Sequence, residues 1–489
     1  LGIVLSTDMD DLFDLNYIPQ YRKIENLIKV WKQRILTLYG KVTLINSLLL
    51  SQLIYKFSML PTPPPYFLAD VQKELSQFLW HDKRPKIKKD VLYNNLQNGG
   101  IRMTEITNKN KAIKTAWVPR LLNSIQNNSA VHTYLQASIS PINLEILLTS
   151  NIKCKDVQKL IQKPIHTFWM EVLETWSNCI YHEPLSKEQV LEEKLWLNSH
   201  ITINKSILYW PTFIDSNILK VKDLLNPQGT WCSYNEFRLR YNDIRCTYVE
   251  YYGLISAIPV LWKRLLTNGL PAMVKSPVQV LLNSESISKS AYQLLMEKCV
   301  GFPHHLIQKW SADLNQEITM DKLKNSFSSL YKITISCNLR AFQFKFLHRI
   351  LPTNHLLKIW QIKDSDTCSF CGQDIETLMH LFYNCHITRN FWLQVKEWIR
   401  SESGITFDFN VTDVMMLTIN ETIPMALLNV LLIAKVFIYK CKQSGSIPFI
   451  FNFDTYISQY IKIEESIAKK RDRILYHYKK WQMFDRLNY

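Results

Sequence analysis

Three cysteines and one histidine lie within the 18 residues from 368 to 385, and their spacing constrains the local fold more than any other feature of the chain. They are Cys368, Cys371, His380 and Cys385. A Cys-x2-Cys turn places two thiolates on one side of a tetrahedral ion, and a histidine and a cysteine about one helical turn apart supply the other side. The pattern predicts a zinc site. The alternative is a pair of buried free cysteines beside an unrelated histidine.

Protein side chains fill all four positions of the predicted site. We therefore expect one structural zinc ion, with no open position for water. Phe370, Leu378, Leu381 and Phe382 would form a small apolar shell. The loop between Cys371 and His380 has little apolar mass, so its order should depend on the ion. His386 is a weaker candidate ligand, because its spacing to Cys385 is unsuitable.

The other seven cysteines are scattered without a pairing rhythm. This usage is typical of a reduced compartment with a metal site rather than of a secreted disulfide framework. We therefore expect an intracellular protein of the cytoplasm or nucleus. Cys337 and Cys441 lie outside the ligand spacing and are interpreted as buried apolar groups.

The chain carries a formal charge of +16, with a pI near 9.2. Such an excess usually faces a polyanion, either nucleic acid or an anionic membrane surface, and charge alone does not choose between them. A merely soluble basic protein is the third reading. The most apolar stretch, residues 425–438, is interrupted by Asn429 and Lys435, which favours a buried helix over a membrane span.

Length and composition predict a mainly α, multi-domain protein. The 489 residues exceed one ordinary core, and 47% of them are hydrophobic. Only 11 are glycine, which favours long helices. Residues 1–18 suggest a short strand and an acidic loop, with Pro19 opening a helix. Apolar residues then recur at helical spacing from Ile24 to Leu38, where Gly40 should break the run; further helices are expected near 44–53, 68–80 and 112–122.

Basic residues gather on the polar face of the first helix and in the segment 83–89. Lysine and arginine neutralise phosphates, so these are candidate nucleic-acid contacts; the alternative is a solvated face. The C-terminal segment from Lys469 to Lys480 is a further basic helix. For individual tryptophans, core packing is favoured over base stacking. The candidate contacts are Arg22, Lys29, Lys32, Arg34, Lys41, Lys83, Arg84, Lys86, Lys88 and Lys89.

No catalytic constellation is predicted. Asp8, Asp10 and Asp11 are consecutive acids in an expected solvated loop rather than a paired-carboxylate metal site. Gly40-Lys41 lacks the upstream glycine and strand of a phosphate loop. Motifs of the HExxH, GxSxG and GxGxxG types do not occur in the sequence.

Two groups of short motifs occur in the chain. The first group consists of Trp31-Lys-Gln-Arg34, Leu38-Tyr-Gly40-Lys41, Gln52-Leu-Ile-Tyr55, Pro61, Phe78-Leu-Trp80 and Gly99-Gly100-Ile101. It resembles the region just after the polymerase palm in LINE-type non-LTR retrotransposon proteins, and Leu1-Gly2-Ile3 resembles the tail of the motif that ends the palm. Phe346-Leu-His-Arg349, the four predicted zinc ligands and Trp392 resemble the zinc-binding segment of the same proteins.

The resemblance implies the C-terminal part of an RNA-directed DNA polymerase without its palm, since the sequence has no Ala-Asp-Asp hairpin. It implies a thumb-like helical region (1–125), a mixed connecting domain (126–325), a zinc-binding domain (326–400) and a C-terminal helical region with a basic tail (401–489). The expected partners are RNA and DNA and an upstream polymerase domain, in a ribonucleoprotein of the nucleus and cytoplasm, without a membrane. A zinc-stabilised protein-interaction scaffold and a decayed transposon product are the alternatives.

Overall fold

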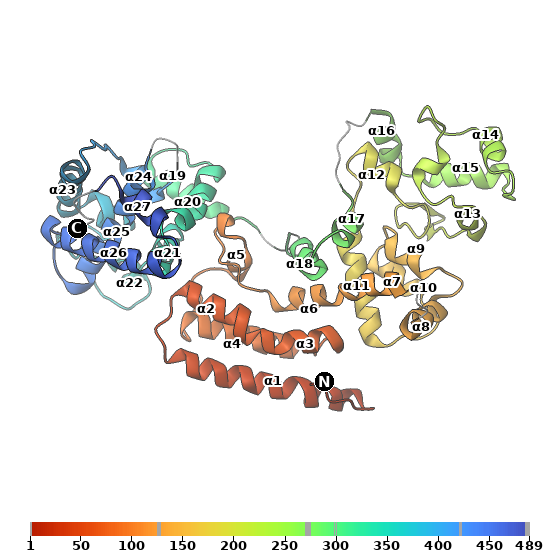
Figure 1. Ribbon diagram of the computed structural model, residues 1–489, viewed down its shortest axis with the longest axis horizontal. Coiled ribbons are helices and arrows are strands. Elements are labelled where there is room, and N and C mark those ends of the chain that lie inside the picture. Colours follow the sequence, from red (N-terminus) through yellow and green to blue (C-terminus); the bar gives the residue numbers. More distant parts are fainter. Residues whose placement is uncertain are drawn as a thin grey trace. The chain divides into compact units, whose positions relative to one another are not determined.

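The computed structural model describes residues 2–124, 129–268, 275–297, 299, 301–419 and 423–484, and these are almost entirely helical. Helices α1 to α27 are accompanied by one antiparallel hairpin, in which β1 (Thr202–Ile203) pairs with β2 (Ser206–Ile207) (Figure 1). The predicted mainly α class is confirmed. Only α1, α23, α25 and α26 have 18 or more residues among the described helices, so the expectation of long helices holds for a minority.

The chain forms two compact units, each assembled from three separate stretches. The first unit comprises Leu1–Glu25, Leu50–Gln72 and Glu105–Cys299. The second comprises Asn26–Leu49, Lys73–Thr104 and Val300–Tyr489. Helices α1 (Met9–Lys32) and α4 (Pro65–Trp80) contribute to both. The four consecutive domains expected from the sequence stay a prediction.

The first unit is built mainly of short helices around an aromatic core. Trp176 and Trp196 are fully buried, and their indole N–H groups donate to the carbonyls of Leu148 (2.6 Å) and Ile218 (2.7 Å). These tryptophans are core residues, as predicted. The unit's helices are α3 (Ser51–Met59), α6 (Ile106–Lys114), α7 (Trp117–Ser124), α8 (Ala130–Ile139), α9 (Leu144–Thr149), α10 (Cys154–Leu160), α11 (Thr167–Ile180), α12 (Lys187–Glu192), α13 (Pro211–Asp215), α14 (Tyr234–Arg240), α15 (Tyr248–Ala257), α16 (Val260–Asn268), α17 (Pro277–Leu282) and α18 (Ile287–Glu297).

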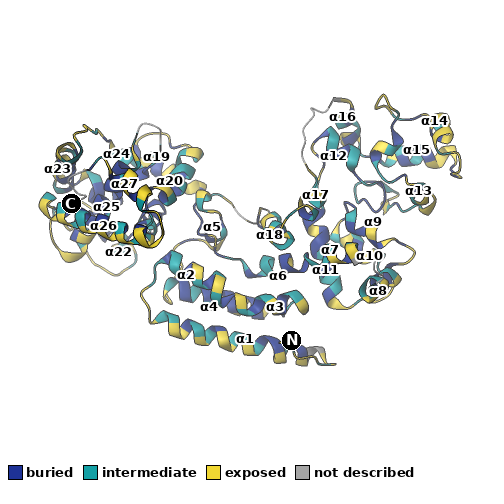
Figure 2. Ribbon diagram, in the orientation of Figure 1, coloured by how far each residue is buried: buried dark blue, intermediate teal, exposed yellow. Residues whose placement is uncertain are grey.

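The second unit packs its helices around α25 (Met425–Ser444), whose buried face is visible in Figure 2. Asn429 and Lys435 are fully buried within α25, so the predicted buried helix is confirmed. Gly404 and Gly445 end α23 and α25 in left-handed conformations, which glycine adopts without steric cost. The unit also contains α2 (Leu38–Leu44), α5 (Lys89–Tyr93), α19 (His304–Leu314), α20 (Met320–Ile333), α21 (Cys337–Leu347), α22 (Asn354–Ile359), α23 (His386–Ser403), α24 (Val411–Met416), α26 (Ile450–Lys470) and α27 (Ile474–Trp481).

Motifs far apart in the sequence meet inside the second unit. The buried ring of His348 donates from Nε2 to the carbonyl of Gly99 at 2.7 Å. Burial lowers the pKa of His348 to about 4, so the ring is neutral at physiological pH. A Cβ on Gly100 would lie 2.0 Å from the Asn94 carbonyl oxygen, so only glycine fits there. The segment around residue 100 and the segment before the cysteine–histidine cluster therefore belong to one core.

The predicted N-terminal elements need correction. Helix α1 begins at Met9 and runs through Pro19, so Asp10 and Asp11 lie in its first turn rather than in a loop, and Asp8 directly precedes the helix. The first residues do not pair as a strand, because the Asn16 side chain accepts from the Val4 N–H (3.0 Å) and donates to its carbonyl (2.7 Å). Gly40 lies inside α2, which Thr37 caps by accepting from the Gly40 N–H at 3.1 Å. The helical run instead ends at Lys32.

Among the described residues, no single helix has the length and apolar character needed to cross a membrane. One bent pair, Leu38–Leu49 with Ser51–Met59, passes the same test by length and composition.

Candidate metal centre

The structure brings the four predicted zinc ligands together. One ligand atom from each of Cys368, Cys371, His380 and Cys385 lies within 4.8 Å of every other. Cys368 Sγ is 4.0 Å from Cys385 Sγ, and Cys371 Sγ is 3.4 Å from His380 Nε2. A tetrahedral ion with Zn–S bonds of 2.3 Å separates its sulfurs by about 3.8 Å. The donor set and its spacing therefore fit a zinc ion held by protein ligands alone.

A tight turn positions the two sulfurs of the Cys-x2-Cys motif. The Cys368 N–H donates to the Asp374 carbonyl at 2.8 Å, and the Gly372 N–H donates to the Cys368 carbonyl at 2.9 Å. Gly372 has φ +68°, a left-handed conformation that glycine adopts without steric cost. The Phe370 N–H points at Cys368 Sγ from 3.4 Å. Backbone geometry alone thus aims both thiols at one point.

The other two ligands lie at the two ends of a single π-helical turn, His380–Asn384: His380 is its first residue and Cys385 follows it directly. The Cys385 N–H donates to the His380 carbonyl at 2.8 Å and closes this turn. Helix α23 begins directly after Cys385 and returns two side chains to the turn. The Trp392 indole donates to the Phe382 carbonyl (2.7 Å), and the Thr388 hydroxyl donates to the Leu381 carbonyl (2.9 Å). Trp392 therefore fixes the turn that presents two ligands.

Without a bound cation, the thiols of Cys368 and Cys371 have different pKa values. Burial raises the pKa of Cys368 to about 12, with the neighbouring Cys385 adding to the effect. Burial also opposes ionisation of Cys371, but the N–H groups of Asp374 and Gln373 and the His380 ring outweigh it and lower its pKa to about 6. Packing several thiolates together is unfavourable until a divalent cation neutralises them.

Glu376 anchors the loop between the two ligand pairs. Its carboxylate is fully buried and accepts from the N–H groups of Asn354 (2.7 Å) and Ser369 (2.8 Å). It also pairs with the Lys442 ammonium of α25 at 2.6 Å. Lys442 in turn donates to the Pro352 carbonyl at 3.0 Å. The loop is therefore tied to the core by a buried ion pair as well as by its ligands, an anchor that the sequence analysis missed.

The second ring nitrogen of the ligand His380, Nδ1, faces the exposed Asp374 carboxylate at 3.6 Å. The other histidine and cysteines considered in the sequence lie outside the ligand set. His386 is exposed and lies outside the ligand cluster. Cys441 is buried, as predicted. Cys337 is exposed at the start of α21, so its interpretation as a buried apolar group was wrong.

Most of the predicted nucleic-acid contacts are exposed. Arg22 and Lys29 lie on the outer face of α1, and Lys32 pairs with Asp82 at 2.8 Å. Arg34 covers the Trp31 ring, with its guanidinium 5.2 Å from the ring centroid. The exposed loop residues are Lys83, Arg84, Lys86, Lys88 and Lys89.

The prediction for Lys41 needs correction. Only 2% of Lys41 is exposed, and its ammonium donates to the carbonyls of Phe78 (2.8 Å) and Leu79 (3.2 Å) near the end of α4. Burial, together with the charges of Lys345 and Lys32, lowers its pKa to about 8, while Asp82 acts in the opposite direction. Lys41 therefore caps a helix end rather than presenting a free charge.

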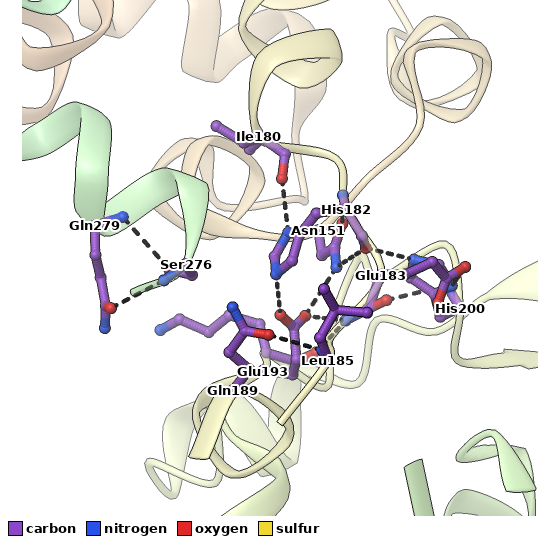
Figure 3. Close-up of polar contacts among 12 residues, drawn as sticks. Asn151, Ile180, His182, Glu183, Leu185, Gln189, Glu193, His200, Ser276 and Gln279 are labelled. Carbon is purple, nitrogen blue, oxygen red and sulfur yellow. Dashed lines mark hydrogen bonds and ion pairs between the residues drawn. The ribbon is translucent and has the colours of Figure 1, made fainter. Parts of the chain in front are cut away.

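A second buried polar cluster lies in the first unit, around Glu193 (Figure 3). His182 Nε2 lies 3.0 Å from Glu193 Oε1, and His182 Nδ1 lies 2.9 Å from the Ile180 carbonyl. Asn151 and Asn198 each donate to Glu193 Oε2 at 3.1 Å. Both ring nitrogens of His182 face acceptor oxygens, an arrangement that favours the protonated ring. Burial opposes this charge, but Glu193 outweighs burial and raises the pKa of His182.

Comparison with known families places the metal centre in context. Residues 288–392 match the family described as zinc-binding in reverse transcriptase. The matched segment contains all four ligands and Trp392, and it begins upstream of residue 326, where the zinc-binding domain was expected to start. The match supports a region related to retrotransposon reverse transcriptases, and the predicted zinc-binding segment is confirmed at this level.

Proposed function

We propose that this chain is the C-terminal, nucleic-acid-holding part of a LINE-type non-LTR retrotransposon reverse transcriptase. The observation that carries the proposal is the convergence of four ligand atoms within 4.8 Å inside a segment that matches the reverse-transcriptase zinc-binding family. The motifs of residues 31–101 support the LINE type. Part of that segment packs with the matched region in one unit.

The zinc ion in this proposal is single and structural. Cys368, Cys371, His380 and Cys385 would hold it, and a closed set of four protein ligands leaves no position for a reacting water. Bound zinc stabilises the thiolates and joins the Cys-x2-Cys turn to the start of α23. The residues of this chain supply the fold around the ion, and no reaction is assigned to the centre.

Nucleic-acid binding is supported by cations that have no internal counter-charge. Lys83, Arg84, Lys86, Lys88 and Lys89 make no ion pair with any residue that the structure describes. Five exposed cations in seven positions create a local potential that attracts phosphates. In the proposed setting they grip RNA template and primer or target DNA, next to an upstream polymerase domain.

The chain as it stands would carry no polymerase chemistry, because the sequence lacks a carboxylate pair of the Ala-Asp-Asp type. Primer extension on an RNA template should be undetectable with the purified chain. Incorporation that disappears on Asp11→Asn would overturn this part of the proposal. The proposed location is a ribonucleoprotein of the nucleus and cytoplasm.

Metal analysis and nucleic-acid titration together test the proposal. We expect one zinc ion per chain, with X-ray absorption showing three sulfur ligands near 2.3 Å and one nitrogen near 2.0–2.1 Å. We also expect RNA affinity to fall steeply with salt, and alanine at the five loop cations to flatten that dependence by up to about one unit for each lost contact. A zinc-loaded chain that binds no RNA or DNA at low salt would favour the protein-interaction scaffold instead.

A further inference from the structure

A basic groove of about 830 Å³ opens in the second unit beside the loop of residues 83–86. Its walls come from that loop, from α19 and from the end of α22. The lining includes four cations and one indole ring, those of Lys83, Arg84, Lys86, Lys309 and Trp360. We propose that this groove binds a single-stranded stretch of nucleic acid, with its phosphates on the cations and one base stacked on Trp360. The inference rests on the nucleic-acid role proposed above and assigns that role to a defined site.

The cations of the groove are free to receive phosphates. Among the residues that the structure describes, Lys83, Arg84, Lys86 and Lys309 have no carboxylate partner. Arg349, also in the wall, is neutralised by an ion pair with Asp313. The groove therefore has a net positive lining contributed by chain segments more than 200 residues apart, from 83–86 and 309.

The cations also crowd one another. Burial lowers the pKa of Lys86, and the neighbouring charges of Lys83 and Lys345 lower it further. Burial likewise lowers the pKa of His305 in the same wall, with Lys309 and Lys88 adding to the effect. Like charges held together without a counter-ion are unfavourable, and a bound phosphate chain relieves this repulsion.

Trp360 distinguishes this groove from a simple phosphate-binding surface. Its ring is partly exposed, and the Lys86 ammonium lies over the ring face at 2.9 Å from the centroid. The flanking Ile359 and Ile362 are 61% and 66% exposed. By contrast, Trp310 is fully buried and donates to the Leu347 carbonyl at 3.0 Å. A base can take the place of the ammonium on the Trp360 face while Lys86 moves to a phosphate.

Stacking on Trp360 selects the form of the nucleic acid. The faces of bases are accessible only where the strand is unpaired, whereas duplexes are held through phosphates and grooves. A volume of about 830 Å³ lies in the range of ~300–1,000 Å³ typical of clefts that enclose small ligands, which suits an unpaired nucleotide with its neighbouring phosphates. An acidic peptide would engage the cations but would leave the ring without a partner.

The test is fluorescence anisotropy of the full zinc-loaded chain with labelled oligo(dT) and with a mixed-sequence duplex of the same length. We expect Trp360→Ala to weaken single-strand binding by roughly 5- to 100-fold without changing the salt slope. Duplex binding should change less than about twofold, since stacking contributes nothing there. Trp360→Phe should restore most of the affinity, and zinc content and circular dichroism report whether each variant folds.

A charge-matched pair separates the groove from other exposed cations of the second unit. Arg84→Ala with Lys309→Ala should flatten the single-strand salt slope by about 0.7 for each lost phosphate contact. Lys332→Ala with Lys462→Ala removes the same charge at exposed positions outside the groove lining and outside the basic loop, and should change the slope less. Equal slopes in the two pairs would overturn the site.

Other results of these binding measurements would contradict either the groove or the proposed function. Equal losses of single-strand and duplex affinity in Trp360→Ala, or no loss, would overturn the proposal. If polyglutamate displaces oligo(dT) equally well from the parent chain and from Trp360→Ala, the groove is a binding site for acidic peptides rather than for nucleic acid. A parent chain that binds no nucleic acid would refute the proposed function itself, a result distinct from failure of the groove.

Discussion

The cluster around Glu193 in the first unit and the cysteine–histidine cluster in the second are both buried and polar, yet only the second has the composition of a metal site. In the first, one carboxylate meets a histidine ring and two amide donors, so its oxygens have partners within the protein. In the second, three thiols and an imidazole converge with no cationic group among them. Converging donors without an internal counter-charge indicate that a cation is to be bound.

Glu376 shows the same difference between a satisfied polar group and a metal ligand within one loop of the second unit. Glu376 lies in the same loop as the ligands, but its oxygens are used by Lys442, Asn354 and Ser369. It therefore resembles Glu193 rather than its neighbours Cys371 and His380.

Removal of a ligand should have the largest effect. Cys371→Ser or His380→Ala should each abolish zinc binding, because a structural site needs its full set of four ligands. Hydrogen exchange should show loss of protection over about 365–395, while α3 and α6 stay protected. Cys441→Ser is the matched control, since that thiol is buried outside the cluster. An equal loss of zinc in Cys441→Ser would place the site elsewhere.

Breaking the buried ion pair should come next. Lys442→Met leaves the Glu376 carboxylate without the one cationic partner that it has among the described residues, which should cost about 3–5 kcal/mol in the free energy of unfolding of the second unit. Zinc should still bind, more weakly, because all four ligands remain. Denaturant unfolding with added zinc measures both quantities. Unchanged stability would mean that the loop does not depend on α25.

The contribution of the Glu193 cluster to stability should depend on pH and not on added metal. The pKa of His182 is raised above its ordinary 6.5, so its stabilisation is complete below about pH 6.5 and is lost as pH rises through the raised value. His182→Phe should cost about 1–3 kcal/mol at pH 6, since Glu193 keeps two amide donors, and less at pH 9. Thermal unfolding across this range measures the difference. A destabilisation independent of pH would mean that His182 is neutral.

Loss of the Asp374 carboxylate, which faces the ligand His380, should have the smallest effect on zinc affinity. Asp374→Asn removes the carboxylate 3.6 Å from His380 Nδ1, and 72% of that side chain is exposed. We expect zinc affinity to fall by no more than about tenfold, at the low end of the effect of such partners. Competition with a zinc-binding dye measures it. A loss as large as that of His380→Ala would show that Asp374 belongs to the ligand set.

The parts of the site that the sequence predicts are those whose signal is local. The four ligands follow from spacing, and the exposed cations of residues 83–89 follow from composition. Glu376 and Lys442 could not be paired in advance, because their contact depends on how α25 packs under the loop. The same holds for Trp360 and Lys309, which join the basic loop only in the folded second unit. Local sequence patterns predict which residues supply the ligands and charges, whereas tertiary packing determines which residues they contact.

The fold shows the same division. Helical periodicity correctly predicts the mainly α class, and the buried α25 follows from its apolar run. The boundaries near Pro19 and Gly40 were wrong for physical reasons that lie outside the local pattern. Pro19 removes the N–H that would bond to the carbonyl of residue 15, and its ring crowds that carbonyl, but it does so on an exposed face where Leu15 is 47% accessible. Gly40 is accepted because the Thr37 cap starts a new helix around it.

The Lys442 contact has a practical consequence for anyone who wishes to produce the zinc-binding region separately. A recombinant fragment that stopped at residue 392, where the family match ends, would contain every metal ligand and Trp392. It would also bring the carboxylate of Glu376 to the surface without its lysine, since α25 begins at Met425. Such a fragment should bind zinc yet precipitate or unfold readily. Extension through Gly445 restores the lysine, but α25 also packs against α26 and α27, so the downstream boundary of a stable fragment lies beyond Trp481.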